Sequence, residues 1–178
     1  MISTIITLHD MRYLKAFLLL SILFSCSPRT SESNDSSDKN QDDTSDAKIE
    51  NLKQALTGEW RNVSMKVNIT SLNNTSRDSV TDVPEGQWET IMDIKPIRTV
   101  FREDGTFRSE YRNLADSIVF VSDGTWSVTG DSLSMTESGN TSSYFTRISN
   151  GKAEFTGYID WDQDGKADDL YFGIQEKF

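Results

Sequence analysis

The sequence predicts an all-β domain, a small antiparallel up-and-down barrel of about eight strands that follows a short helical turn. Two observations predict it. Short stretches of alternating apolar and polar residues recur after residue 57, and turn-forming dipeptides that contain glycine separate them at regular intervals. No long crossover segment intervenes, so consecutive strands are expected to pair, and eight or nine strands suffice to close a barrel. A two-sheet sandwich is the competing architecture.

The helical turn is predicted over residues 49–56. Ile49, Leu52 and Leu56 fall on one helical face, and Thr57-Gly58 ends the turn. The barrel domain is therefore expected to span residues 49–178.

The first strand shows the alternation clearly, with apolar side chains at every second position from Val63 to Ile69. Trp60 is out of phase with Val63, which predicts a bulge between them. Later strands are predicted around Phe107/Ser109/Tyr111, Trp126/Val128, Leu133/Met135, Phe155/Ile159 and Leu170/Phe172/Ile174. Their turns are predicted at Asp104-Gly105, Asp123-Gly124, Gly130-Asp131, Asn150-Gly151 and Asp164-Gly165.

Residues 1–25 have the pattern of a secretory signal. Arg12 and Lys15 precede an apolar run, and Ser25 stands directly before Cys26. The apolar run, residues 16–24, is shorter than the roughly 20 residues that a transmembrane helix needs. Met11 is an alternative start, since residues 1–10 add nothing that such a signal requires.

The end of this segment, Leu23-Phe24-Ser25-Cys26, resembles the lipobox of bacterial lipoproteins. The resemblance implies acylation of Cys26, for example by palmitate, and makes this cysteine the first mature residue. We therefore expect a lipid anchor in the bacterial cell envelope, at the outer membrane. The orientation is open between the periplasm and the cell surface. Residues 26–48, rich in Ser, Asp and Asn, are predicted to be a disordered acidic tether.

The mature chain is strongly acidic. The full sequence has 18 basic and 28 acidic residues, and removal of Arg12, Lys15 and Asp10 leaves 16 and 27, a net charge of −11. Such a surface repels nucleic acid and anionic headgroups, so the lipid is expected to provide the membrane attachment. We expect a monomer that does not bind nucleic acid.

Composition also restricts the chemistry. The single histidine, His9, lies in the predicted signal, and the single cysteine is used for the anchor. This excludes Ser-His-Asp and Cys-His catalysis, zinc sites with histidine or thiolate ligands, and a disulfide within the folded domain. Carboxylate chemistry, a lysine nucleophile or an oxygen-ligated metal remain.

Several short motifs occur in the order found in one protein family. They are Gly58-Glu59-Trp60, Phe101-Arg102-Glu103-Asp104-Gly105-Thr106-Phe107, Gly124-Thr125-Trp126 and Gly130-Asp131-Ser132-Leu133. Together they resemble the lipocalin-like lipoproteins of Gram-negative bacteria over residues 52–178. The resemblance implies a small barrel with the Trp60 indole capping one end. The chain departs from the family in lacking a clear Thr-Asp-Tyr segment and an arginine on the last strand, where the nearest cation is Lys177.

Residues 160–169 carry the sharpest chemical pattern. Three aspartates at alternate positions precede Gly165, which permits a tight turn, as in calcium loops. The predicted ligands are the side chains of Asp160, Asp162, Asp164 and Asp168 and the carbonyl of Lys166. Tyr171 occupies the twelfth position, where an EF-hand has a bidentate Glu, so the pattern favours a short structural Ca²⁺ loop between strands. An acidic hairpin turn is the alternative.

The leading hypothesis is a non-enzymatic barrel that binds a small apolar ligand or a partner. The candidate ligand-binding residues are Trp60, Met65, Val67, Phe107 and Trp126, although both tryptophans also suit a core role. The alternative is a glycan- or protein-interaction module with exposed Tyr111, Tyr144 or Trp161. A carboxylate hydrolase would need two facing carboxylates from Asp93, Glu103, Glu110 and Glu154, and their spacing brings none together.

Overall fold

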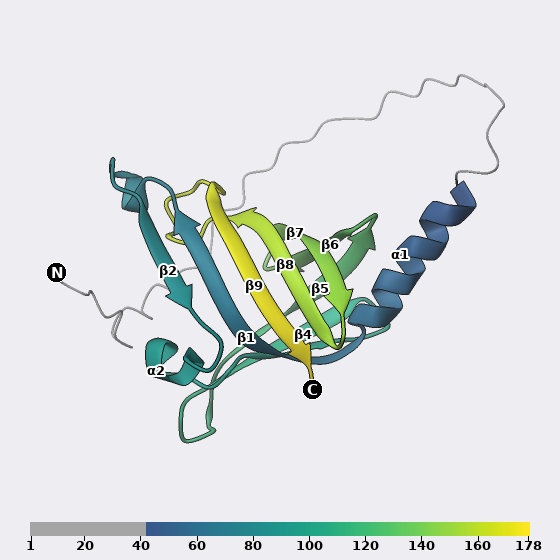
Figure 1. The fold of residues 1–178 in the computed structure, drawn as a ribbon, viewed down its shortest axis with the longest axis horizontal. Helices are drawn as coiled ribbons and strands as arrows, with labels where there is room; N and C mark the ends of the chain where they lie inside the picture. Colours follow the sequence, from purple (N-terminus) through teal and green to yellow (C-terminus); the bar gives the residue numbers. More distant parts are fainter. Residues whose placement is uncertain (1–41) are drawn as a thin grey trace.

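We describe residues 42–178 of a computed structural model; the predicted signal, Cys26 and most of the predicted tether lie outside the described residues. Two α-helices, one short 3₁₀ helix and nine strands make up this part of the chain (Figure 1). In order they are α1 (Asp42–Leu56), β1 (Gly58–Ile69), η2 (Leu72–Asn74), β2 (Ser79–Val83), α2 (Trp88–Met92), β3 (Arg98–Phe101), β4 (Thr106–Arg112), β5 (Ile118–Thr129), β6 (Ser132–Glu137), β7 (Asn140–Ser149), β8 (Lys152–Ile159) and β9 (Asp169–Lys177). None of the helices among these residues has the length and apolarity to cross a bilayer.

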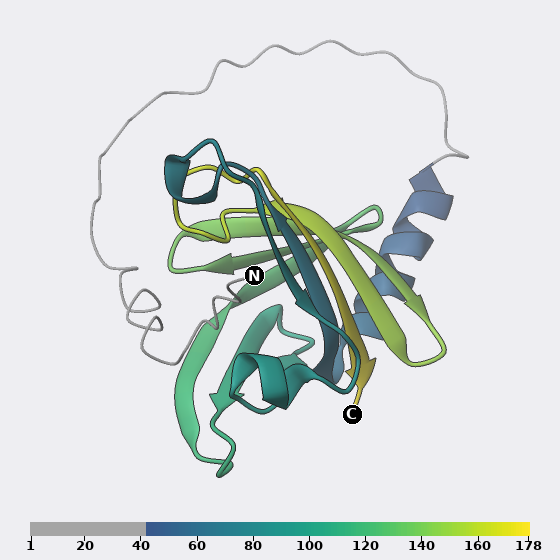
Figure 2. The same cartoon turned by 60° about the vertical axis from the view of Figure 1, so that its left-hand side comes forward.

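The strands form a closed antiparallel barrel, which confirms the predicted fold and rules out the sandwich. Strands β3 to β9 each pair with the next, and β9 returns to pair with β1 (Figures 1 and 2). The other edge of β1 is shared between two strands, because β3 pairs with residues 58–61 and β2 with residues 65–69. The ring therefore has eight strands, and β2 is an additional strand on its wall.

The closed sheet has two apolar clusters. One surrounds Trp60 and Leu56 at the end where α1 enters, with Phe101, Phe107, Trp126, Leu133, Ala153 and Phe155. The other lies under β2 and α2, with Met65, Val67, Ile69, Val83 and Trp88. Because the chain has no cysteine beyond Cys26, these two clusters carry the packing on which its stability depends.

Strand β1 follows the predicted pattern. Met65, Val67 and Ile69 are buried, and the pairing with β9 shifts register between Asn62 and Ser64, which is the predicted bulge. The helix is longer than predicted. It begins at Asp42 rather than residue 49, so the last part of the predicted tether is helical.

One predicted turn is wrong. Asp123-Gly124 lies inside β5 rather than between strands, and Gly124 has an extended backbone. A methyl group at Gly124 would overlap the Thr136 carbonyl oxygen and approach the Phe107 ring to 2.7 Å. Glycine is thus required at position 124 for close cross-strand packing. In the sequence alone, a glycine with this role cannot be distinguished from a glycine that marks a turn.

The other turn predictions are confirmed, with Gly105, Gly130, Gly151 and Gly165 at positive φ between strands. The sequence did not predict α2, the additional strand β2 or the two-residue turn Ser138-Gly139 between β6 and β7. The last strand alternates as predicted but with the opposite phase. The register turns Tyr171 and Gly173 inward, and Phe172 is exposed.

Candidate functional site

One end of the barrel is closed by a dry aromatic floor. The Trp60 indole Nε1 donates a 2.6 Å hydrogen bond to the Leu56 carbonyl, and both side chains are fully buried. The Lys177 ammonium lies 5.4 Å from the Trp60 ring centroid and donates to the Ala55 carbonyl at 3.0 Å. A cation over the indole face and a satisfied Nε1 fix this ring in place. The floor is therefore built around Trp60, with lysine in the position where the family resemblance implies arginine.

A second indole completes the floor. Trp126 packs edge-on against Phe101, with ring centroids 5.2 Å apart, and its Nε1 donates to the Arg102 carbonyl at 3.0 Å. Phe107 lies 6.3 Å from Phe101. These aromatic contacts fill the closed end with side chains.

Above the floor the inward face becomes polar. Thr99 and Ser109 share a buried 2.8 Å hydrogen bond, and Ser122 pairs with Ser109 across β4 and β5. The side-chain Oε1 of Gln175 is buried without a hydrogen-bond partner. Buried polar atoms without partners are costly in a packed core, so this level of the interior suits water or a bound polar group.

Three tyrosines face one another beyond that level. Tyr144 and Tyr171 meet edge to face with centroids 5.6 Å apart, and Tyr111 packs against Phe120 at 5.2 Å. Burial raises the pKa of Tyr111 to about 12, with Glu137 and Tyr144 adding to the effect. Burial also raises the pKa of Tyr144 and of Tyr171. Each of the three residues as a whole keeps an intermediate solvent exposure. Their phenol groups are surrounded by protein, which is the cause of the raised pKa values.

The charge inside the barrel is acidic. The register places Glu137 and Asp169 on the inward face. Among the basic residues of the described strands, Lys177 alone shares that face, and the floor holds it. A field of this sign favours a neutral or cationic guest over an anionic one.

The predicted ligand-binding residues divide between the two clusters. Trp60, Phe107 and Trp126 belong to the floor, whereas Met65 and Val67 face inward under β2 and α2. The structure brings the tyrosines together in addition. Their sequence signal was alternation, because Tyr111 follows Phe107 and Ser109 at steps of two.

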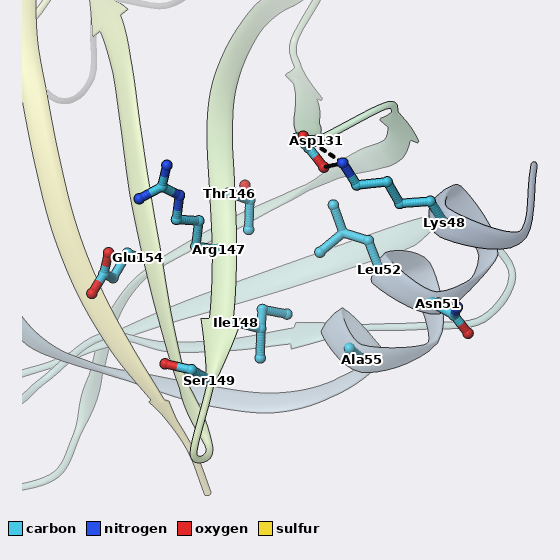
Figure 3. Close-up of a pocket in the computed structure, with 10 residues that line it drawn as sticks. All are labelled: Lys48, Asn51, Leu52, Ala55, Asp131, Thr146, Arg147, Ile148, Ser149 and Glu154. Atoms are coloured by element: carbon cyan, nitrogen blue, oxygen red, sulfur yellow. Dashed lines mark hydrogen bonds and ion pairs between the residues drawn. The ribbon is translucent and has the colours of Figure 1, made fainter. Parts of the chain in front are cut away.

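An open groove of about 610 Å³ lies between α1 and β7, at the end of the barrel where α1 packs on the floor (Figure 3). Leu52 and Ile148 line its centre, and Lys48 bridges to Asp131 at 2.8 Å along one side. Both charged groups are well exposed, so this ion pair contributes little to stability. The groove is open and mixed in character.

A row of aromatic side chains lies exposed on the outer face of β7, β8 and β9. Phe145 and Phe172 flank Thr156 in the register, and Tyr158 follows it on β8, with exposures of 44%, 39% and 63%. Of the aromatics expected to be exposed in an interaction module, Tyr111 and Tyr144 face inward, and Trp161 is half-buried against the second apolar cluster.

Two of the aspartates of the predicted calcium loop gather with Asp169 at the rim between β8 and β9, and the predicted ligands Asp164 and Asp168 are outside this group. Asp160, Asp162 and Asp169 place one carboxylate oxygen each within 4.8 Å of one another. Two loops meet here, because Asp169 accepts from the backbone N–H of Thr70 at 2.9 Å and of Trp161 at 2.8 Å. Asp169 was not in the predicted ligand set.

The carboxylates considered for hydrolysis do not form a catalytic pair in this part of the chain. Glu110 is held by Arg112 at 2.7 Å and Arg108 at 3.3 Å, and the hydrogen bond from Arg112 lowers its pKa. A general acid needs the opposite shift. Glu103 lies in the β3–β4 turn and Glu154 on β8.

No protein-family model and no curated protein matches the sequence. A search of solved structures matches a lipocalin-like protein from Bacteroides uniformis, which is 11% identical. The match covers 70% of this chain and 99% of that chain, with a TM-score of 0.41. The strand pairing of this chain, and not that likeness, establishes its barrel.

Proposed function

We propose that this protein is a lipid-anchored lipoprotein of the bacterial envelope whose barrel binds a small, largely apolar ligand. The observation that carries the proposal is the group of Tyr111, Tyr144 and Tyr171, three residues of intermediate exposure that face inward beyond the buried floor. A barrel of eight strands is wide enough either to be filled or to hold one small ligand. Here apolar side chains fill the floor and form a second cluster under β2 and α2, and the three tyrosines lie on the inward face between strands β4, β7 and β9.

The chemistry of the interior limits the ligand class. Aromatic faces suit apolar or cationic groups, and phenol hydroxyls donate to and accept from a polar end group. Glu137 disfavours a carboxylate or phosphate beside it. We therefore propose a neutral or cationic amphiphile rather than a free fatty acid.

The chain from Ser27 onward, incubated with a cell lipid extract and repurified, should carry a co-eluting compound identifiable by mass spectrometry. Filling the interior with Ser142→Trp should abolish its retention, because Ser142 is inward and adjoins Tyr144. The matched control is Ser143→Trp, whose side chain is exposed on the outer face. Equal retention by both variants, or no co-eluting compound in the unmodified chain, contradicts the proposal.

The anchor is tested separately. Cys26→Ala should leave the signal uncleaved by the lipoprotein peptidase and remove lipid-dependent partition into the detergent phase. Processing at the same position in this variant would show that Cys26 is not the lipidated residue.

The second candidate is an interaction module for glycan or protein, and the exposed row of Phe145, Tyr158 and Phe172 favours it. Exposed aromatic groups in a row are typical of binding surfaces. Under this proposal Tyr158→Ser abolishes partner capture from envelope extracts, while Ser142→Trp leaves it intact.

A structural calcium ion in the loop of residues 160–168 belongs to the same proposal as a support of the rim. Ligand binding in the interior does not depend on it.

A further inference from the structure

The β8–β9 loop is already wound as a cation-binding loop. Asp160 accepts hydrogen bonds from the backbone N–H of Asp164 at 2.9 Å and of Gly165 at 3.1 Å. Asp162 accepts from Asp164 as well, at 3.2 Å. Gly165 has φ +91°, a value that few other residues adopt. The acidic side chains are thereby turned toward the loop's own interior.

Two buried carboxylate oxygens in this loop accept no hydrogen bond. The Asp164 side chain is 1% exposed, and the one cation near its Oδ2 among the described residues is the Lys166 ammonium, at 3.5 Å. Asp168 Oδ1 is likewise buried without a hydrogen bond. Burying a carboxylate oxygen without a hydrogen-bond donor has a desolvation cost, and a bound cation offsets that cost. These atoms are at the fifth and ninth positions of the predicted Ca²⁺ loop.

The tenth and twelfth positions differ from the sequence expectation. Asp169, at the tenth, places an oxygen within 4.8 Å of those of Asp160 and Asp162. Tyr171, at the twelfth, turns into the barrel and contacts Tyr144. Asp169 thus offers the additional carboxylate that Tyr171 cannot.

The same loop is fastened to the β1–β2 loop (Figures 1 and 2). The backbone N–H of Asn73 donates to Asp162 Oδ2, and Asn74 Nδ2 donates to the Asp164 carbonyl at 3.1 Å. Lys166 Nζ donates to Asn74 Oδ1 at 2.7 Å and lies 3.5 Å from Asp164 Oδ2. Residues on the β1–β2 side therefore bind the very aspartates that carry the calcium pattern.

We infer that a calcium ion held by Asp160, Asp162, Asp164, Asp168 and Asp169 acts as a latch that fixes the β1–β2 loop to the β8–β9 loop. The inference rests on the calcium part of the proposed function and is independent of any ligand in the interior. Oxygen ligands from a flexible loop select Ca²⁺ over the smaller, strictly octahedral Mg²⁺. Lys166 acts as the competing cation, since its ammonium lies 3.5 Å from the Asp164 oxygen that accepts no hydrogen bond.

Ion binding is measured on the full mature chain in detergent. Millimolar Ca²⁺ should raise the melting temperature by several degrees over chelator, and Mg²⁺ should do so poorly. Terbium should show sensitised emission through Trp161, which stands between Asp160 and Asp162. Asp162→Asn should lose both effects, and the control Asp123→Asn, on an exposed β5 carboxylate, should keep them.

Lys166→Met separates the ion from a simple salt bridge. If Lys166 competes with calcium, the variant binds calcium more tightly and gains a larger calcium-dependent shift in melting temperature. If Lys166 alone neutralises the aspartates and no calcium binds, the variant should lose stability and its melting temperature should not respond to calcium.

The latch itself is read by trypsin cleavage after Arg77, an exposed residue of the β1–β2 loop. If cleavage requires release of this loop, calcium slows it by up to 1 + [Ca²⁺]/Kd, about a hundredfold at 100 Kd. Asn74→Ala should weaken that protection while terbium emission persists. Emission with unchanged cleavage after Arg77 would overturn the latch alone. Absence of both emission and a melting shift in the unmodified chain would overturn the ion, and neither result bears on ligand retention.

Discussion

Tyr111 makes the polar interior measurable through alkaline pH. Burial, with Glu137 and Tyr144 adding to it, raises the pKa of Tyr111 to about 12, against 10 for an ordinary tyrosine. The folded state then retains its proton where the unfolded state has lost it. The stability contributed is complete below pH 10 and is lost as pH rises toward 12.

The magnitude follows from those two values. At pH 11 the unfolded phenol is about ten parts ionised to one neutral, and the folded phenol is the reverse. The difference lowers the free energy of unfolding by about 1.4 kcal/mol relative to neutral pH. Tyr111→Phe has no proton to lose, so this loss disappears in the variant.

The assay is urea unfolding of both chains at pH 8 and pH 11. Other groups titrate in both chains, so their contributions cancel in the difference in free energy of unfolding between the two chains. Between pH 8 and pH 11 this difference should shift by about 1.4 kcal/mol in favour of the phenylalanine variant. Glu137→Gln should bring the absorbance titration of Tyr111 to lower pH, because it removes the neighbouring negative charge. A difference between the chains that stays constant from pH 8 to pH 11 would show that Tyr111 is as solvated as an unfolded phenol and would refute the enclosed interior.

Two further changes test the packing. Gly124→Ala should lower the free energy of unfolding by about 1–3 kcal/mol in urea titrations, since its methyl group overlaps the Thr136 carbonyl and crowds the Phe107 ring. A neutral or stabilising result would show that close cross-strand packing does not require glycine at this position. Leu56→Ala should cost about 2–5 kcal/mol, because Leu56 is fully buried in the floor and accepts the Trp60 hydrogen bond only through its backbone. In thermal unfolding an unchanged midpoint for Leu56→Ala would mean that α1 does not close the barrel.

The fold could be predicted from sequence because alternation and turn chemistry are local. Each strand of the ring has a period of two, and four of the five predicted turns lie between strands with glycine at positive φ. Asp123-Gly124 failed because close cross-strand packing and a turn use the same residue for different reasons. The phase of β9 failed for a related reason, since its outer face carries Phe172 and the inner face uses Gly173 to make room for the Tyr171 ring.

The candidate site was harder to predict, because its members come from distant strands. Tyr111, Tyr144 and Tyr171 lie on β4, β7 and β9, and only closure of the ring brings them together. Asp169 was missed because the calcium pattern counts positions along one loop. Its role depends on Thr70, which directly follows the end of β1.

Substitutions at the two ends of the barrel should have different effects. Floor residues such as Trp60 have their polar atoms satisfied by protein, so substitutions there should change stability before they change binding. Beside the floor residue Ala153, Gln175 has a buried oxygen without a hydrogen bond, and at the rim Asp164 has another. Polar atoms without a hydrogen-bond donor contribute little to the stability of the empty protein and gain hydrogen bonds or ion contacts from something bound. We therefore expect variants of Gln175 and of the rim to alter stability chiefly when ligand or calcium is present, which separates them from variants of the apolar floor residues in any matched pair of melting curves.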